Sequence, residues 1–291
     1  MAQQTRVAVV TGVVSFSPSE RISAIHTPDG GLAILRQLAS DSAGPLVVYA
    51  STRAGTLPEG VAEECQPHVK ILPVRLSLRD PSSIDALASR VAKEQAAVDV
   101  LINNAGVYYY RERISDAERA DTLETNYWGT LRMCQAFLPI LRNPGGRIVN
   151  VSSQAGRLRW LAPHLRPRFL ARDLTLEELD GLVREYDAAA ARGGEVKAGW
   201  PPMAYSVSKA ALNAFTRILA REHPGLLINS CCPGWVKTDL GAQAGPPPKT
   251  PEEGARIPLH LAFGEIGDTS GQYWANDSTG DSGIGKVQPA L

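Results

Sequence analysis

The stretch VAVVTGVVSFSPSERISAIHTPDGGLAILRQLA, residues 7 to 39, decides how this chain is interpreted. It opens on an apolar run that reaches Thr11 and Gly12, which is typical of a buried strand entering a glycine turn. It closes on LAILRQLA, the pattern of a helix with one apolar face. A strand, a glycine turn and a helix N-terminus in this order can bind the phosphates of a nucleotide. Here eighteen residues rich in Ser, Pro and charge separate Gly12 from Gly31, so the turn is either broken or interrupted.

Outside this stretch, short apolar runs alternate with longer helical patterns, which predicts βαβ units and a parallel sheet. The runs are continuous in Val, Ile and Leu, so we expect helices on both faces of the sheet. The sequence thus predicts an α/β fold, a Rossmann-type doubly wound parallel sheet in a single domain over residues 1–291. We expect strands at residues 7–10, 46–49, 69–74, 98–102, 147–151 and 226–230, with a short one at GQYW near Gly271. We expect helices at residues 32–38, 82–94, 116–141, 203–222 and 251–263.

Three segments depart from this alternation. Residues 13–30 are an anomalous insertion in the glycine-rich turn. Residues 154–202 form a second insertion, before Tyr205, and contain the helical pattern TLEELDGLVREYDAAAA with acidic residues in its first turn. We interpret this second insertion as a lid or a surface cover, and a mere spacer is the alternative. Residues 241–250 are a Gly- and Pro-rich loop that we expect beside the substrate.

The composition argues against several classes of function. Lys plus Arg and Asp plus Glu number 30 each, so nothing favours nucleic acid or an anionic membrane as a partner. No apolar run approaches the roughly 18 residues of a membrane span, and the N-terminus lacks the pattern of a secretory signal. The four cysteines show no C-x-x-C spacing and the five histidines are scattered. We therefore expect reduced thiols, a cytoplasmic location and no metal site.

The motif YSVSK carries the first chemical signal. It places Tyr205 and Lys209 four residues apart, on one face of an expected helix. A phenol titrates at about pH 10, so it is too weak an acid to protonate a developing alkoxide efficiently at neutral pH. A neighbouring ammonium favours the phenolate and lowers the pKa of the phenol toward the working range. The spacing alone is a weak signal, and its context strengthens it.

Four further motifs lie at expected strand ends or in a facing helix. GRIVNVSS ends a strand with Ser152 and Ser153, where a hydroxyl can bond a substrate carbonyl. LINNAG ends the preceding strand, and Gly106 lets the chain turn tightly beside a ligand. TNYWGT places Asn126 inside a helix, where an amide is unfavourable unless it has a specific role. INSCCPGWVKTDL follows the next strand and contains the turn Pro233-Gly234.

With these motifs in this order, the chain resembles the short-chain dehydrogenase/reductase family, and within it the carbonyl reductase branch. The resemblance runs from about Val7 to Trp274. The long insertion before Tyr205 and the sequence CCPGWVKTD, followed later by TPEEGA, suggest the branch. In that branch the insertion covers a helix surface that other members use for tetramer assembly, so the resemblance implies a monomer. It also implies a small-molecule carbonyl substrate.

The resemblance implies a catalytic set. Tyr205 would donate a proton to the substrate oxygen as hydride reaches the carbon, and Lys209 would hold the nicotinamide ribose and lower the pKa of Tyr205. Ser153 would orient and polarise the carbonyl, with Ser152 as its rival, and Asn126 would hold a water in the proton relay. The expected cofactor-binding residues are Gly12, Gly31, Arg53, Asn104, Ala105, Gly106, Tyr205, Lys209, Pro233, Gly234, Val236 and Thr238.

The end of the second expected strand bears on the choice of nicotinamide. LVVYASTR ends in Ser51, Thr52 and Arg53, without the acidic residue that bonds a ribose 2′-hydroxyl and selects NAD. A guanidinium beside hydroxyl donors suits a 2′-phosphate, so we expect NADP(H). An exposed surface arginine is the alternative. Ser77 stands where the family usually has an Asp for the adenine amino group, and we expect Asp80 to cap or precede the next helix.

The glycine-rich turn leaves the function open in one respect. Thr11 and Gly12 match the start of the family pattern T-G-x-x-x-G-x-G and Gly31 matches its end, but the middle glycine has no clear counterpart. The insertion is a genuine loop in a working enzyme, a translated unspliced or misassigned exon, or part of a real protein that has lost cofactor affinity. These three interpretations stay open.

The sequence as a whole favours an NADPH-dependent oxidoreductase that reduces a ketone, aldehyde or quinone to the alcohol, with Tyr205 as the general acid. One alternative is an NAD(P)-dependent alcohol dehydrogenase that uses the same residues in the oxidative direction. The other is a cofactor-impaired protein that senses or binds a dinucleotide. The interrupted turn argues for this last alternative, and the intact catalytic set argues against it.

Overall fold

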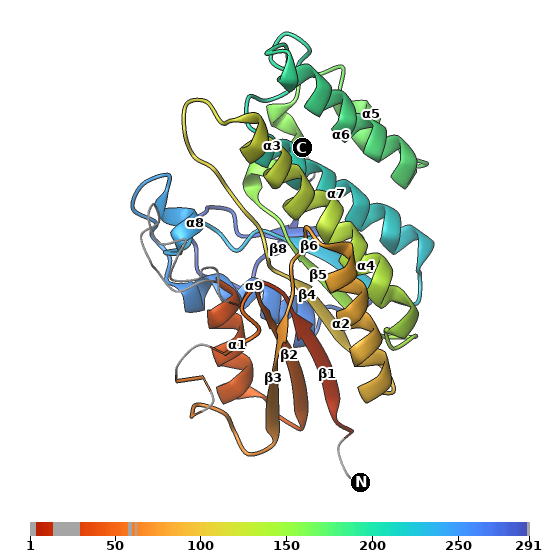
Figure 1. Cartoon of the computed structure of the whole chain (residues 1–291), viewed down its shortest axis with the longest axis vertical. Coiled ribbons are helices and arrows are strands. Elements are labelled where there is room, and N and C mark those ends of the chain that lie inside the picture. The colour runs from red at the N-terminus through yellow and green to blue at the C-terminus, as the bar shows by residue number, and fades with distance from the viewer. Residues whose placement is uncertain (1–3, 14–29, 58–59, 62, 290–291) are drawn as a thin grey trace.

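The computed structural model describes residues 4–13, 30–57, 60–61 and 63–289. Within these residues the chain forms one sheet of eight strands in the order β3-β2-β1-β4-β5-β6-β7-β8, with helices on both faces (Figure 1). The strands β1 to β7 pair in parallel, and β8 pairs antiparallel with β7 at one edge. The strand order reverses between β1 and β4, which is where ligands bind in doubly wound sheets. The predicted fold class is confirmed.

The strands follow the apolar runs closely. They are β1 (Arg6–Val10), β2 (Leu46–Thr52), β3 (Val69–Arg75), β4 (Val100–Asn103), β5 (Arg147–Val151), β6 (Leu227–Cys231), β7 (Tyr273–Ala275) and β8 (Lys286–Gln288). The start predicted for β4 at residue 98 is wrong, because Val98 forms only an isolated bridge with Leu141. The sequence analysis did not predict β8, a three-residue edge strand that is mostly exposed and has no apolar run.

The helices described are α1 (Gly30–Asp41), α2 (Pro81–Glu94), α3 (Asp116–Leu123), α4 (Thr130–Phe137), α5 (Arg166–Leu170), α6 (Leu176–Ala191), α7 (Ala204–Glu222), α8 (Asp239–Ala242) and α9 (Pro251–Phe263). Capping boxes start α3, α6 and α9, because a Ser or Thr is followed three residues later by Glu. Asp80 caps α2, as expected, by accepting a hydrogen bond from the Ser82 N–H at 3.0 Å.

The single helix predicted over residues 116–141 is wrong in its interior. Between α3 and α4 the residues Glu124–Gly129 form a π-helix (η2), and Leu138–Ile140 form a 3-10 turn (η3) after α4. A Cβ atom on Gly129 would lie 2.5 Å from the carbonyl oxygen of Leu78, so only glycine allows this close approach to the segment after β3. The π-helix therefore coincides with a contact between parts of the chain that are distant in sequence. The helical periodicity of the sequence cannot indicate such a contact.

Two apolar clusters fill the space between the sheet and its helices. One lies under α1 and α9 and includes Leu35 and Ile257, and the other lies under α2, α4 and α7 and includes Phe215. A chain of buried polar bonds crosses the second cluster. Asn103 donates to Asn150 at 2.9 Å, and Asn150 donates to Thr216 of α7 at 2.9 Å. Buried bonds of this kind are costly to leave unmade, so they fix α7 against β4 and β5.

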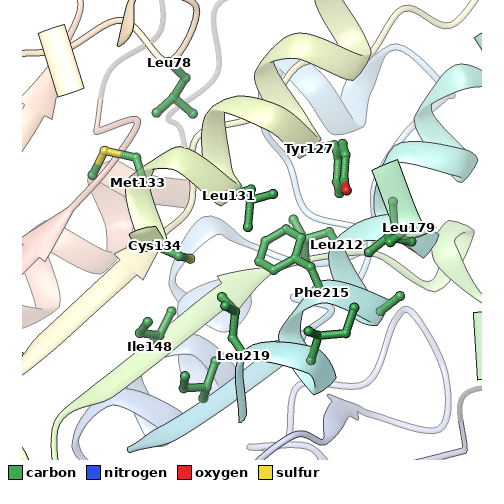
Figure 2. Packing of buried hydrophobic residues seen from close by; sticks show 14 of the residues in the cluster. Leu78, Tyr127, Leu131, Met133, Cys134, Ile148, Leu179, Leu212, Phe215 and Leu219 are labelled. Carbon is green, nitrogen blue, oxygen red and sulfur yellow. The ribbon is translucent and has the colours of Figure 1, made fainter. Parts of the chain in front are cut away.

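The insertion at residues 154–202 lies on the outer side of α3 and α7 (Figure 1). Its helix α6 shares the apolar cluster of α7, and Figure 2 shows Leu179 of α6 among the side chains of this cluster together with Tyr127 and Phe215. An ion pair at 2.7 Å between Arg119 of α3 and Asp187 of α6 ties the same elements together. The insertion thus extends the core of the domain.

Candidate active site

The side chains of the motifs come together at the carboxyl ends of the central strands and at the start of α7. Gly106, which follows β4, shows how closely they approach. A Cβ atom there would lie 3.2 Å from Oδ1 of Asn126 and 3.5 Å from Nζ of Lys209. Tyr205 and Lys209 lie in the first two turns of α7, and Ser153 follows β5. The motifs therefore form one cluster at the carboxyl ends of the strands, near the point where the strand order reverses.

Tyr205 lies between Ser153 and a second aromatic ring. The centroids of the Tyr108 and Tyr205 rings are 4.5 Å apart. Burial raises the pKa of Tyr205, and a hydrogen bond with the Ser153 side chain opposes this rise. The pKa of Tyr205 thus lies above that of an ordinary phenol, and not below it as we expected from Lys209, whose ammonium lies 5.6 Å from the Tyr205 ring centroid. The phenol therefore keeps its proton at neutral pH but is a weaker acid than an exposed tyrosine.

Lys209 is buried with its ammonium at the end of β5. Its side chain is 4% exposed, and Nζ donates a hydrogen bond to the carbonyl oxygen of Val151 at 2.8 Å. Burial lowers the pKa of Lys209 to about 8, because an apolar environment disfavours the charged form. The ammonium therefore persists at neutral pH but is lost in mildly alkaline solution.

Asn126 occupies the π-helix and uses its amide fully within the protein. Its Oδ1 accepts from the N–H of Val107 at 2.8 Å, and its Nδ2 donates to the Val107 carbonyl at 2.9 Å and to the Ser208 hydroxyl at 3.2 Å. The amide thus holds the loop after β4 through both the N–H and the carbonyl of Val107. This arrangement explains why an amide is retained inside a helix.

The two candidate serines have different surroundings. Ser152 is 2% exposed, and its hydroxyl donates to the backbone carbonyl of Lys209 at 3.4 Å. Ser153 is half-buried, accepts from the N–H of Ala155 at 3.1 Å and interacts with Tyr205. The structure therefore brings Ser153, and not Ser152, to the phenol.

Gly12 and Gly31 meet in space although eighteen residues separate them in the sequence. A Cβ atom on Gly31 would lie 2.1 Å from the Gly12 carbonyl oxygen and 2.6 Å from Nδ2 of Asn104. Gly12 has a φ of 67°, and a Cβ atom on it would lie 2.6 Å from Cα of Ala105. The amide of Asn104 donates to the carbonyls of Thr11 and Gly12 at 3.2 and 3.1 Å. The end of β1 and the start of α1 are thus in contact, while residues 14–29 of the predicted insertion lie outside the described residues.

The remaining predicted cofactor residues lie at three turns. Arg53 is exposed directly after β2. Gly234 has a φ of 93°, and a Cβ atom there would lie 2.6 Å from the carbonyl oxygen of Thr279. Val236 is buried and bridges to Lys249, and the Thr238 hydroxyl caps α8 by accepting from the Gly241 N–H at 3.1 Å. Pro233 accepts a hydrogen bond at 2.6 Å from the ammonium of Lys249.

Three residues near these turns were not predicted. Tyr108 packs on Tyr205, and the run of three tyrosines after LINNAG was the available signal. Gln243 bonds the Tyr108 carbonyl at 2.8 Å and the Tyr110 N–H at 3.2 Å, which ties the loop after β6 to the loop after β4. Lys249 is fully buried beneath Gly234. Gln243 and Lys249 lie in the loop at 241–250 that we expected beside the substrate, but no pattern marked either residue, because both contact residues distant along the chain.

Two other kinds of feature are missing from the part of the chain that the structure describes. None of its helices has the length and apolar character to cross a membrane. No three side chains of the types His, Cys, Asp and Glu gather there as metal ligands do.

The chain is similar to known proteins over most of its length. A family model described as short chain dehydrogenase matches residues 30–163, and this match begins where α1 begins. Carbonyl reductase [NADPH] 1 of Sus scrofa is 35% identical over 276 residues, which cover 90% of this chain and 89% of the relative. Its namesake in Homo sapiens is 37% identical over 250 residues, which cover 80% and 86%. The solved structure of salutaridine reductase from Papaver somniferum superposes with a TM-score of 0.75 at 24% identity, and covers 94% of this chain and 100% of that one. The chain belongs to the short-chain dehydrogenase/reductase family.

Proposed function

We propose that this chain is an NADPH-dependent reductase that converts a ketone, an aldehyde or a quinone to the alcohol. The observation that carries the proposal is the placement of Tyr205, which is hydrogen-bonded to Ser153 and has the ammonium of Lys209 5.6 Å from its ring centroid, beside the carboxyl ends of the central strands. Relatives named carbonyl reductase [NADPH] 1, at about one third identity over most of the chain, support both the reaction and the cofactor.

The residues at this edge fit a dinucleotide. Glycine at positions 12, 31 and 106 lets the end of β1, the start of α1 and the loop after β4 approach one another closely, because a Cβ atom at any of them would collide with or crowd its neighbours. A helix N-terminus directs N–H groups and a partial positive charge toward a phosphate, and the first turn of α1 has no acidic residue. Arg53 follows β2 on the same side, where a 2′-phosphate needs a cation. We propose that these residues, together with Asn104, Ala105, Pro233, Gly234, Val236 and Thr238, hold NADP(H).

The chemistry divides between the cofactor and the side chains. When bound, NADPH supplies the hydride. Tyr205 transfers its phenolic proton to the carbonyl oxygen, and Ser153 donates a hydrogen bond to the same oxygen and orients it. Lys209 remains charged at neutral pH, so it stabilises the phenolate that Tyr205 becomes and is available to hold ribose hydroxyls. Asn126 acts as a positioning residue in this proposal, because both N–H bonds of its amide are used within the protein.

The loss of NADPH absorbance with a panel of ketones, aldehydes and quinones tests this proposal. Tyr205→Phe should lower kcat by about 10²–10⁴-fold while calorimetry shows unchanged NADPH binding, because only the transferred proton is removed. Tyr110→Phe is the matched control, since Tyr110 is 55% exposed and should leave kcat unchanged. Equal activity of the two variants would remove Tyr205 from the mechanism.

A titration of the folded chain with NADPH separates the reductase from its alternatives. Binding followed by turnover supports the reductase, and binding without turnover of any carbonyl or alcohol favours a dinucleotide-binding protein. An absence of binding contradicts both of these functions and means that the insertion impairs the binding of the cofactor. Arg53→Ala should raise the KM for NADPH and leave that for NADH unchanged, because only NADPH carries the 2′-phosphate. Sequencing of the transcript across residues 13–30 tests whether the insertion is translated.

We further propose that the chain is a monomer in the cytoplasm. The insertion at 154–202 occupies the outer face of α3 and α7, which supports a monomer. All four cysteines are free thiols, as in most proteins of a reducing compartment. Light scattering after size-exclusion chromatography and cell fractionation test the two statements separately.

A further inference from the structure

A cavity of about 260 Å³ lies beside α7, away from Tyr205. One wall is a stripe of α7 that carries Asn213 and Arg217, one helical turn apart. The insertion supplies the opposite wall through Leu158 and Phe169, and the hairpin of β7 and β8 supplies Val287. The residues of the expected catalytic set, Asn126, Ser153, Tyr205 and Lys209, do not line this cavity, so it is distinct from the proposed active site.

Arg217 gives the cavity a positive charge that none of the described residues neutralises. Its guanidinium is half-buried and donates to the Phe169 carbonyl at 2.8 Å. Within the described part of the chain no carboxylate pairs with it, and none of the described residues that line the cavity is acidic. Burial and the neighbouring Arg221 both lower the pKa of Arg217, which shows that its charge is unfavourably placed. A half-buried cation in this position is stabilised by an anion.

Asn213 adds an unused hydrogen-bond acceptor. Its Oδ1 is buried and has no hydrogen-bond partner among the described residues. Buried amide oxygens are nearly always paired, and a lone one is costly. A ligand with an O–H or N–H group directed at Asn213 satisfies it, while a carboxylate on the same ligand satisfies Arg217.

The shape of the cavity restricts the ligand further. Asn213 and Arg217 lie four residues apart, so their side chains leave α7 on the same face and can contact one ligand. A cavity of about 150 Å³ accommodates benzene, so 260 Å³ leaves room for two small substituents. Leu158, Phe169 and Val287 provide apolar contact for the ring. We propose that this cavity is a second binding site, for a small aromatic hydroxycarboxylate.

Calorimetric titration of the NADPH-loaded chain with 4-hydroxybenzoate tests the proposal, and 4-hydroxybenzamide is a neutral probe of the same shape. The acid should bind about tenfold more tightly than the amide, because a charged hydrogen bond is stronger than a neutral one. Arg217→Met should abolish this preference. Arg221→Met is the matched control: Arg221 also donates to backbone carbonyls of the insertion, at Arg172 and Leu174, but does not line the cavity, so the preference should persist.

Further measurements locate the site. The Tyr205→Phe variant, loaded with NADPH and saturated with a carbonyl that the unaltered chain reduces, should bind the acid with unchanged affinity, and a loss of binding would assign the acid to the active site. Dissociation constants above about 10 mM for both probes would also overturn the proposal. So would an equal loss of preference in Arg217→Met and Arg221→Met. A chain shortened to Pro289 should bind equally well, and a large gain in affinity would show that its own last residues compete for the cavity.

Discussion

Replacing Gly31 by Ala tests whether α1 begins in contact with the end of β1. A Cβ atom on Gly31 would lie 2.1 Å from the Gly12 carbonyl oxygen and 2.6 Å from Nδ2 of Asn104, and real Cβ atoms essentially never show contacts under 3.0 Å. The first of these atoms is backbone. The second is held by two hydrogen bonds, to the carbonyls of Thr11 and Gly12. The junction therefore has to move if a methyl group is added.

The adjacent Gly30 provides the matched control. A Cβ atom on Gly30 would meet only Oδ1 of Asn104, at 3.6 Å, which is ordinary van der Waals contact. Gly→Ala at a compatible site stabilises a protein by about 0.4–1 kcal/mol, because it reduces the entropy of the unfolded chain. Overpacking a close contact costs about 1–3 kcal/mol. We expect Gly31→Ala to lower the free energy of unfolding by the second amount and Gly30→Ala to raise it by the first.

Urea denaturation with and without NADPH measures both effects. For a ligand at one hundred times its dissociation constant, the expected stabilisation is about 2.7 kcal/mol. Gly30→Ala should keep this stabilisation, and Gly31→Ala should lose most of it, since the shifted backbone no longer fits the phosphates. The reasoning is refuted if the two variants unfold at the same urea concentration and respond equally to NADPH. The flanks of the insertion would then not form the phosphate site.

Three further predictions concern the cluster around Tyr205. Burial holds the pKa of Lys209 at about 8, below its ordinary value of 10.5, so Lys209 binds more protons in the unfolded chain between these values and contributes a rise with pH to the free energy of unfolding. Lys209→Met should flatten that rise in urea titrations at several pH values, and an unchanged slope would mean that Lys209 is solvated. Asn126→Leu leaves the N–H and carbonyl of Val107 unpaired, so we expect the same titrations at neutral pH to show a loss of about 1–3 kcal/mol. Gln243→Ala removes the bonds that hold the backbone at Tyr108. Steady-state kinetics should show a severalfold rise in the KM for the carbonyl and no change for NADPH, whereas a change in the NADPH value alone would contradict this assignment.

The sequence predicted those parts of the fold that depend on local patterns. Continuous apolar runs marked the central strands, and the position of Asp80 marked the start of α2. The π-helix was not predictable in this way, because it coincides with the contact between Gly129 and the carbonyl of Leu78, far away in sequence. The edge strand β8 has too few apolar residues to be recognised.

In the candidate site, too, local features were predictable from the sequence and contacts between distant parts of the chain were not. Tyr205 and Lys209 share one helix, so their spacing alone brought them together. Ser152 and Ser153 were harder to distinguish, because neighbouring residues of an extended segment point in opposite directions and the sequence does not say which faces α7. Gln243 meets Tyr110 across 133 residues, and no periodicity reports such a contact. The pKa of Tyr205 depends on burial, which spacing cannot measure.

The shared core of α6 and α7 has a consequence for the motions of this protein. Amide protons of α6 should exchange with solvent only when the whole domain unfolds, because the helix cannot leave without exposing the apolar face of α7. The loops that meet at Gln243 are joined near the surface by two hydrogen bonds, and their amides should exchange through small local openings. Local opening of these two loops should therefore be easier than any movement of α6, although α6 belongs to the insertion.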